Sequence, residues 1–125
     1  MKQQGEFIFR GEICGTMRYG GIILEVESIP VTHSGKGELV IDFGINNAYQ
    51  NAVSFGIEYF FDNYSKKYSV DLMVNVLVIR DMPLDTSNGI ITYATVMAML
   101  SALDATIEGF FLDKATGILA LPLNK

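Results

Sequence analysis

The sequence is short of the residues that build disulfides and metal sites. Its 125 residues include one cysteine, Cys14, and one histidine, His33. A single cysteine excludes a disulfide within the chain, and neither residue has a second ligand at the spacing of a metal site. We therefore expect no metal and no cofactor. The first ten residues also lack the apolar core of a secretory signal, so the cytoplasm is the expected compartment.

Positive charge is scarce as well. Nine lysines and arginines stand against fourteen acidic residues, which gives a net charge of -5. Because nucleic acids are bound mainly through basic groups, this balance disfavours a nucleic-acid partner. The longest apolar run, from Gly89 to Leu103, is shorter than the roughly 18 residues that span a bilayer, and it contains polar residues. We expect a buried helix there and no membrane segment.

The chain has enough apolar material for one core, since half of its residues are hydrophobic. It is too short for two ordinary domains, so residues 1–125 are expected to form a single domain.

Hydrophobic periodicity predicts strands in the first third of the chain. The stretches Glu6–Arg18 and Ile22–Val31 have strand composition, and the two glycines in the first of them predict a bent or bulged strand. A polar turn over residues 32–37 then leads to a third strand, Glu38–Phe43. We expect the second and third strands to pair as a hairpin.

The rest of the chain alternates between helix and strand. A helix capped by Asn46 or Asn47 is expected to run to Tyr64, followed by a strand from Tyr68 to Arg80 that is covered on both sides. A second helix follows Ser87, and the runs Ile107–Leu112 and Gly117–Leu121 are expected to close the chain as a hairpin. This order of elements is an α+β plan.

Ser87 has the most informative position in the sequence. The polar turn D-M-P-L-D-T-S-N opens directly into the apolar helix, which puts one hydroxyl at a helix start. Such a serine is either an N-cap or a nucleophile beside the free backbone N–H groups of the first turn. A cap is the commoner role.

The ordered series of segments resembles the proteolytic domain of Lon-type proteases. The matching pieces are G-G-I-I-L-E-V-E, G-K-G-E-L-V-I-D-F-G, A-Y-Q-N-A-V-S-F-G-I-E-Y-F, D-L-M-V-N-V-L-V and S-N-G-I-I-T-Y-A-T-V-M-A-M-L-S-A-L, which cover roughly residues 20–103. This resemblance implies the ribosomal protein S-five domain-two-like fold, with a mixed sheet of about five to six strands backed by two helices. The translocation domain of elongation factor G shares that fold, and its likeness to the turn and second helix is weaker.

The resemblance also implies roles for particular residues. Ser87 matches the nucleophilic serine, and backbone groups at Asn88 and Gly89 match the oxyanion site. Lon-type catalysis also needs a lysine as general base, for which Lys125 is better placed than Lys114, because Lys114 sits beside Asp113 in a polar turn. However, the Gly-Pro pair before the family's serine is missing, and so is the helix that carries the family's lysine.

Two other motifs are weaker. His33 could complete a Ser-His-Asp set with Ser87 and either Asp42 or Asp85, although a lone histidine in a polar turn is usually solvated. The G-K-G turn around Lys36 lacks the rest of a phosphate loop, so no ATPase module is expected.

These observations favour a Lon-like domain that has lost its chemistry and serves as an assembly or protein-binding module. Its expected partner is a protein or peptide, and Lon-type rings make a homo-oligomer possible. Four phenylalanines could form the contact patch if they lie outside the core, namely Phe7, Phe9, Phe110 and Phe111. The alternatives are a serine peptidase with a Ser-Lys dyad and a ribosome-directed domain resembling that of elongation factor G.

Overall fold

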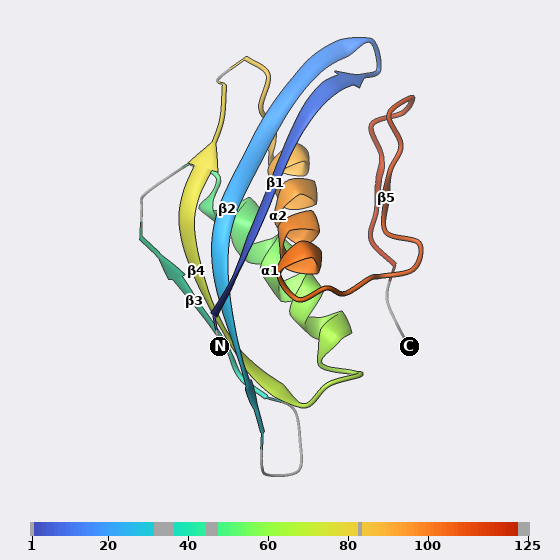
Figure 1. Ribbon diagram of the computed structural model, residues 1–125. Helices are drawn as coiled ribbons and strands as arrows, with labels where there is room; N and C mark the ends of the chain where they lie inside the picture. Colours follow the sequence, from blue (N-terminus) through green and yellow to red (C-terminus); the bar gives the residue numbers. More distant parts are fainter. Residues whose placement is uncertain (1, 32–36, 45–47, 83, 123–125) are drawn as a thin grey trace.

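The computed structural model describes residues 2–31, 37–44, 48–82 and 84–122. Its elements follow the expected order of three strands, a helix, a strand, a helix and two short strands (Figure 1). They are β1 (Lys2–Ile13), β2 (Thr16–Pro30), β3 (Leu39–Phe43), α1 (Gln50–Tyr64), β4 (Val70–Arg80), α2 (Asn88–Ala102), β5 (Phe111–Leu112) and β6 (Leu119–Ala120). The α+β class predicted from the sequence is confirmed.

Four strands form one mixed sheet in the order β1-β2-β4-β3. β2 is antiparallel to both β1 and β4, whereas β3 runs parallel to β4. The expected hairpin between Ile22–Val31 and Glu38–Phe43 is therefore wrong, because β4 lies between these two strands. The expectation that the strand from Tyr68 to Arg80 is covered on both sides is also wrong, because α1 and α2 pack on one face of β4 and its side chains Met73 and Leu77 are exposed on the other.

The region Glu6–Arg18 is not one bent strand but a hairpin. Cys14 and Gly15 form its two-residue turn, and both have a positive φ, of 54° and 77°. Tight hairpin turns need this conformation because it matches the twist of the flanking strands, and Asn-Gly or Asp-Gly is the usual sequence that provides it. Cys-Gly lacks that signal, which explains why the sequence reads as a continuous strand here.

β5 and β6 form a separate two-stranded antiparallel sheet, so the six strands are divided between two sheets. The closing hairpin expected over Ile107–Leu112 and Gly117–Leu121 is present in this form. In Figure 1 this C-terminal segment lies on the opposite side of α2 from the four-stranded sheet. The molecule therefore has three layers: a sheet, a pair of helices and a short hairpin.

Both helices cover the same face of the four-stranded sheet, and the main core lies between these layers (Figure 1). Its most completely buried side chains come from four elements, namely Ile22, Leu24, Val26, Val53, Ile57, Phe60, Leu72, Val74, Val76, Ile91, Ala98 and Met99. The two helices approach closely at Gly56, where a Cβ atom would lie 3.1 Å from the Cβ of Thr95. Glycine at this position therefore permits the close helix contact.

α1 ends at Tyr64 as predicted, and its first residue, Gln50, follows an N-cap at Tyr49 that makes no side-chain capping bond. The expected caps, Asn46 and Asn47, lie outside the described residues, as does most of the turn expected over residues 32–37. Within the described ranges, no helix has both the length and the apolar character that crossing a bilayer requires.

Candidate functional site

The turn before α2 is fixed by hydrogen bonds centred on Thr86. The Thr86 hydroxyl donates to the carbonyl oxygen of Tyr19 at 2.6 Å and accepts from the amide of Met82 at 2.8 Å. The amide of Tyr19 in turn donates to the carbonyl of Asp85 at 3.0 Å. Thr86 is almost fully buried. These bonds attach the turn to β2 and fix the position of Ser87, the next residue.

Ser87 is the N-cap of α2. Its backbone is extended, with φ -132° and ψ 164°, and its hydroxyl oxygen accepts a hydrogen bond from the amide of Ile90 at 3.3 Å. An N-cap side chain satisfies one of the backbone donors that the first turn leaves without an intrahelical acceptor. The capping role predicted from the sequence is thus observed, and the nucleophile role stays a prediction.

A hollow of about 240 Å³ lies beside Ser87. Its walls come from the β1–β2 turn, the start of α2 and the C-terminal hairpin, and they are formed by Ile13, Cys14, Thr16, Arg18, Ser87, Gly89, Ile90, Leu112, Gly117 and Leu119. The structure therefore brings Ser87 and Gly89 together, whereas Asn88 is exposed outside the hollow. None of the described lining residues is a lysine, and the only cation among them is Arg18.

The two lysines considered as general bases are placed differently. Lys125 lies outside the described residues. Lys114 is exposed in the turn between β5 and β6, where its ammonium nitrogen lies 5.8 Å from the ring centroid of Phe9 and its carbonyl accepts from the amide of Cys14 at 2.8 Å. Lys114 does not line the hollow beside Ser87.

The proposed Ser-His-Asp set is not assembled with Asp42. Leu39, Ile41 and Phe43 of β3 pack against the main core, so Asp42, which alternates with them, points to the other side of the sheet from α2. Asp85 lies near Ser87 in the turn. His33 and Lys36 lie outside the described residues.

The four phenylalanines do not form an exposed patch. Phe9 is buried, and Phe7 and Phe9 both make edge-on contacts with Tyr93, at ring centroid distances of 5.5 and 6.2 Å. Phe110 stacks on the other side of Tyr93 at 5.6 Å. Only Phe111 is exposed. This aromatic cluster attaches the C-terminal segment to α2 and β1.

A different surface carries exposed apolar side chains. We call it the outer face: the side of the four-stranded sheet that points away from α1 and α2. Five of its apolar side chains are exposed by 41 to 50%, namely Ile8, Ile29, Val40, Met73 and Leu77. Ile23 and Val78 lie opposite each other near its centre. Sequence reasoning missed this surface because it depends on which strands are neighbours.

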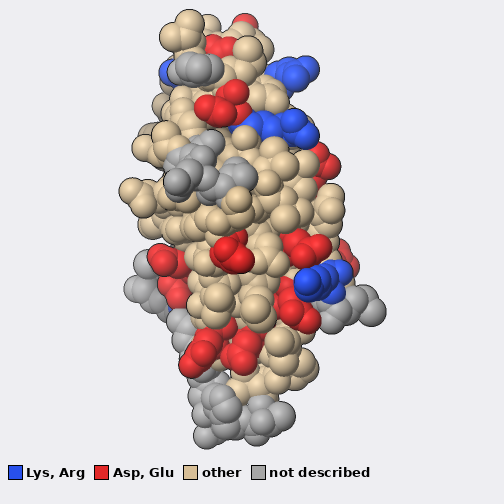
Figure 2. All heavy atoms as spheres, turned by 90° about the vertical axis from the view of Figure 1, so that its left-hand side faces the viewer, with Lys and Arg blue, Asp and Glu red and all other residues tan. Residues whose placement is uncertain are grey.

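Acidic residues alternate with these apolar side chains. Glu25 of β2 lies opposite Asn75 of β4, and Asn75 in turn lies opposite Asp42 of β3. Two residues further along β2, Glu27 lies opposite Met73 of β4. Glu6, Glu12 and Asp71 also lie on this face by strand alternation. Figure 2 shows carboxylates along the whole length of this face and most of the cations toward its upper end. The ammonium of Lys2 lies 3.8 Å from Glu25.

No set of three or more metal-binding side chains occurs within the described part of the chain. No protein-family model and no curated protein matches the sequence. Among solved structures, a protein from Thermus thermophilus is similar with a TM-score of 0.58 and 18% identity. That likeness covers 83% of this chain and 16% of the Thermus chain, so this chain spans a small part of that protein's length. It shows a shared fold alone.

A second solved structure is a mevalonate kinase from methicillin-resistant Staphylococcus aureus. It has a TM-score of 0.39 and 15% identity, over 85% of this chain and 40% of the kinase. Similarity at this level carries no conclusion about either fold or function.

Proposed function

We propose that this chain is a Lon-like assembly or protein-binding module that carries out no chemistry at Ser87, and that it binds its partner through the outer face. The cytoplasm is the compartment we propose, from the single cysteine. The observation that carries the proposal is the outer face, a wide sheet surface that no described element covers.

The composition of the outer face supports a protein partner. Its exposed apolar side chains, Ile8, Ile29, Val40, Met73 and Leu77, lie on a single sheet face. Exposed apolar side chains gathered on one face and interspersed with polar groups are typical of a contact with another protein. The interleaved carboxylates favour a partner that presents lysine or arginine beside apolar side chains, because opposite charges steer association and disfavour other partners.

The Ser87 geometry supports the non-catalytic part of the proposal. The hydroxyl oxygen already accepts from the helix amide of Ile90, and no lysine is among the described residues around it. A serine hydroxyl is a weak nucleophile unless a base within hydrogen-bond reach takes its proton.

The test is site-specific photo-crosslinking in cells of the source organism. A photoreactive phenylalanine analogue replaces Met73 on the outer face or, as the matched control, Phe55 on the exposed side of α1; these residues are 43% and 51% exposed. We expect protein adducts from position 73 and few from position 55. Sedimentation of the purified protein shows whether the adduct partner is a second copy.

Charge provides the second arm of the test. Glu25→Gln combined with Glu27→Gln is expected to weaken the adduct at position 73 and to reduce its sensitivity to salt, because surface electrostatic attraction is screened by ions. Equal adduct yields at positions 73 and 55, from a protein that sediments as a monomer, would refute the proposal.

The peptidase alternative rests on Ser87 and Gly89 sharing the hollow at the start of α2. It requires that Ser87→Asn, which keeps a capping side chain and removes the hydroxyl, abolishes cleavage of a casein or peptide substrate. Unchanged cleavage in this variant would exclude Ser87 as the nucleophile.

A ribosome-directed domain is a further candidate, and the placement of the cations favours it. Arg10, Arg18 and Arg80 all lie toward the end of the sheet where the β1–β2 turn is, and Lys114 contacts that turn. A local basic end can bind phosphates even on an acidic protein. The check is cosedimentation with ribosomes across a salt series, for the natural protein and a triple Arg→Gln variant.

A further inference from the structure

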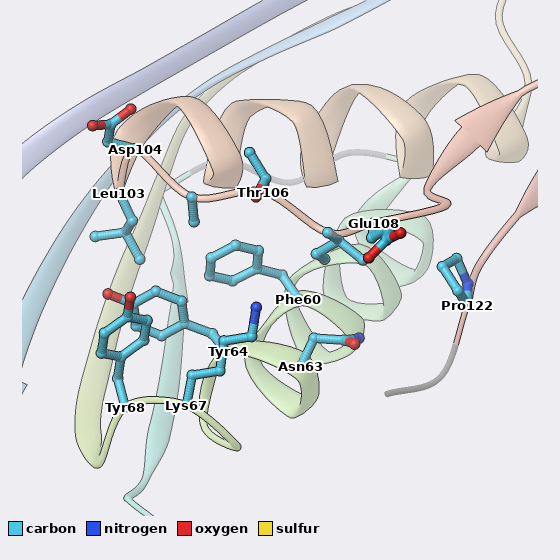
Figure 3. A pocket seen from close by; sticks show the side chains of 12 residues that line it. Phe60, Asn63, Tyr64, Lys67, Tyr68, Leu103, Asp104, Thr106, Glu108 and Pro122 are labelled. Carbon is cyan, nitrogen blue, oxygen red and sulfur yellow. The ribbon is translucent and has the colours of Figure 1, made fainter. Parts of the chain in front are cut away.

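A second cavity lies at the other end of the helix pair from Ser87. Its volume is about 460 Å³, and it is bounded by the end of α1, by the residues that follow α1 and by the segment that follows α2 (Figure 3). Twelve residues line it: Phe60, Asn63, Tyr64, Lys67, Tyr68, Leu103, Asp104, Ala105, Thr106, Ile107, Glu108 and Pro122. This volume is in the range of sites for small organic molecules.

Aromatic rings form one wall of the cavity. The rings of Phe60 and Tyr64 are stacked with centroids 5.2 Å apart, and Tyr64 and Tyr68 are 4.7 Å apart. Burial raises the pKa of Tyr64, with a further contribution from Tyr68, so its phenol stays neutral at physiological pH. Leu103 lies beside these rings at the start of the segment after α2 (Figure 3), and Ile107 of the same segment also lines the cavity. An apolar ligand body therefore has a fixed surface to pack against.

Two opposite charges lie at separate places in the same cavity. The side chain of Lys67 reaches inward from the end of α1, and the carboxylate of Glu108 lies toward the Pro122 end (Figure 3). Asp104 also borders the cavity, but its carboxylate points away from the centre (Figure 3). Lys67 makes no ion pair with any residue in the described ranges.

The geometry points to a binding site for a small zwitterion with an apolar body, of the class of the aromatic or large aliphatic amino acids. The ligand carboxylate pairs with Lys67, its ammonium pairs with Glu108, and its side chain packs on Phe60 and Tyr64. A ligand that carries only one charge leaves the other protein charge without a partner. Neither the outer face nor Ser87 takes part, so this inference is independent of the proposed function.

The expected affinity is weak. Lys67 and Glu108 are both exposed, and an exposed ion pair changes an equilibrium by about twofold to fivefold. A ligand of this size, with two such contacts and one packed ring, is expected to have a Kd on the order of 1 mM.

The test uses three probes of similar shape: phenylalanine, 3-phenylpropionate, which lacks the ammonium, and phenethylamine, which lacks the carboxylate. Each is titrated into the full-length protein while backbone amide shifts are followed by NMR. Phenylalanine is expected to bind most tightly, with the largest shifts at residues 103–108 and 64–68.

Two variants assign the charges. Lys67→Gln is expected to weaken phenylalanine and 3-phenylpropionate by about twofold to fivefold and to leave phenethylamine unchanged. Glu108→Gln is expected to weaken phenylalanine and phenethylamine by a similar factor. The controls are Lys66→Gln, at a neighbouring residue outside the cavity, and Asp104→Asn, whose side chain points away; neither should alter any of the three affinities.

The inference is overturned if either single-charge probe binds as tightly as phenylalanine. It is equally overturned if the shifts lie elsewhere, or if none of the probes shifts the cavity amides at concentrations on the order of 10 mM, well above the expected Kd. All four substituted positions are exposed, so the fingerprint spectrum of each variant reports directly on whether its fold is intact.

Discussion

Replacing Ser87 by alanine removes the N-cap of α2 and should destabilise the protein. Replacing an N-cap serine by alanine lowers the free energy of unfolding by about 0.5–2 kcal/mol. Two features of the structure decide where Ser87 lies in this range. The amide of Ile90 that Ser87 caps belongs to a buried residue, which raises the cost of leaving it unpaired. However, Ile90 also borders the hollow, so water can replace the lost acceptor, and the bond is long at 3.3 Å. We expect a loss of about 1 kcal/mol.

The assay is urea denaturation followed by circular dichroism. Ser87→Ala should lower the midpoint without changing the slope, and for a chain of 125 residues the loss corresponds to a Tm lower by about 3–5 °C. Ser87→Asn is the matched control, because asparagine caps as well as serine does and has no hydroxyl. The cap reasoning is refuted if alanine and asparagine at position 87 give the same stability. A function that is lost in Ser87→Asn at full stability would instead identify a chemical role for the hydroxyl.

Three further predictions concern the fold. Gly5→Ala should destabilise the protein by about 2–3 kcal/mol, because the added Cβ would overlap the carbonyl oxygen of Ala98. Gly11→Ala, on the same face of β1, should have a far smaller effect, because its Cβ would meet no atom closer than 3.5 Å. Equal denaturation midpoints for the two variants would contradict this packing. Thr86→Val should cost about 2 kcal/mol, since it leaves the Tyr19 carbonyl and the Met82 amide without a partner, and urea midpoints again decide. Burial raises the folded-state pKa of three tyrosines. The unfolded chain therefore loses its tyrosine protons first, near pH 10, and stability should fall as the pH rises above that value. Below that pH these tyrosines give no pH dependence; a parallel titration of phenolate absorbance and urea midpoint between about pH 8 and pH 12 tests the sign. The affected residues are Tyr59, Tyr64 and Tyr93.

The parts of the fold that the sequence predicts are those with a local physical cause. β4 is rich in β-branched and other apolar residues, α2 has an apolar run after a capping residue, and the positions of both follow from the sequence alone. The strand pairing does not, because it depends on contacts between segments that are far apart in the chain. β4 takes the place beside β2 that a hairpin with β3 would have occupied.

The candidate sites divide in the same way. Ser87 is visible in the sequence because a cap and its helix are adjacent in the chain. The hollow beside Ser87 is not visible in the sequence. Two of its lining residues, Cys14 and Arg18, come from the β1–β2 hairpin, whose turn lacks the usual turn residues. The row of Glu25, Asn75 and Asp42 exists only through the sheet register, and the cavity with Lys67 and Glu108 only through the approach of two helix ends. Sequence spacing records none of these distances.

β1 is a twelve-residue strand at the edge of the four-stranded sheet, and no other described strand pairs with its free side. An edge of this length offers its unpaired N–H and C=O groups to the strands of other molecules, which is a route to fibrous aggregation. Its outward-pointing residues include Lys2, Glu6, Arg10 and Glu12, so charge recurs along the strand. A strand that paired with this edge would have to place its own side chains next to these charges, which opposes such pairing. Neutral, apolar replacements at these four positions should therefore make the protein prone to precipitate long before they affect its fold.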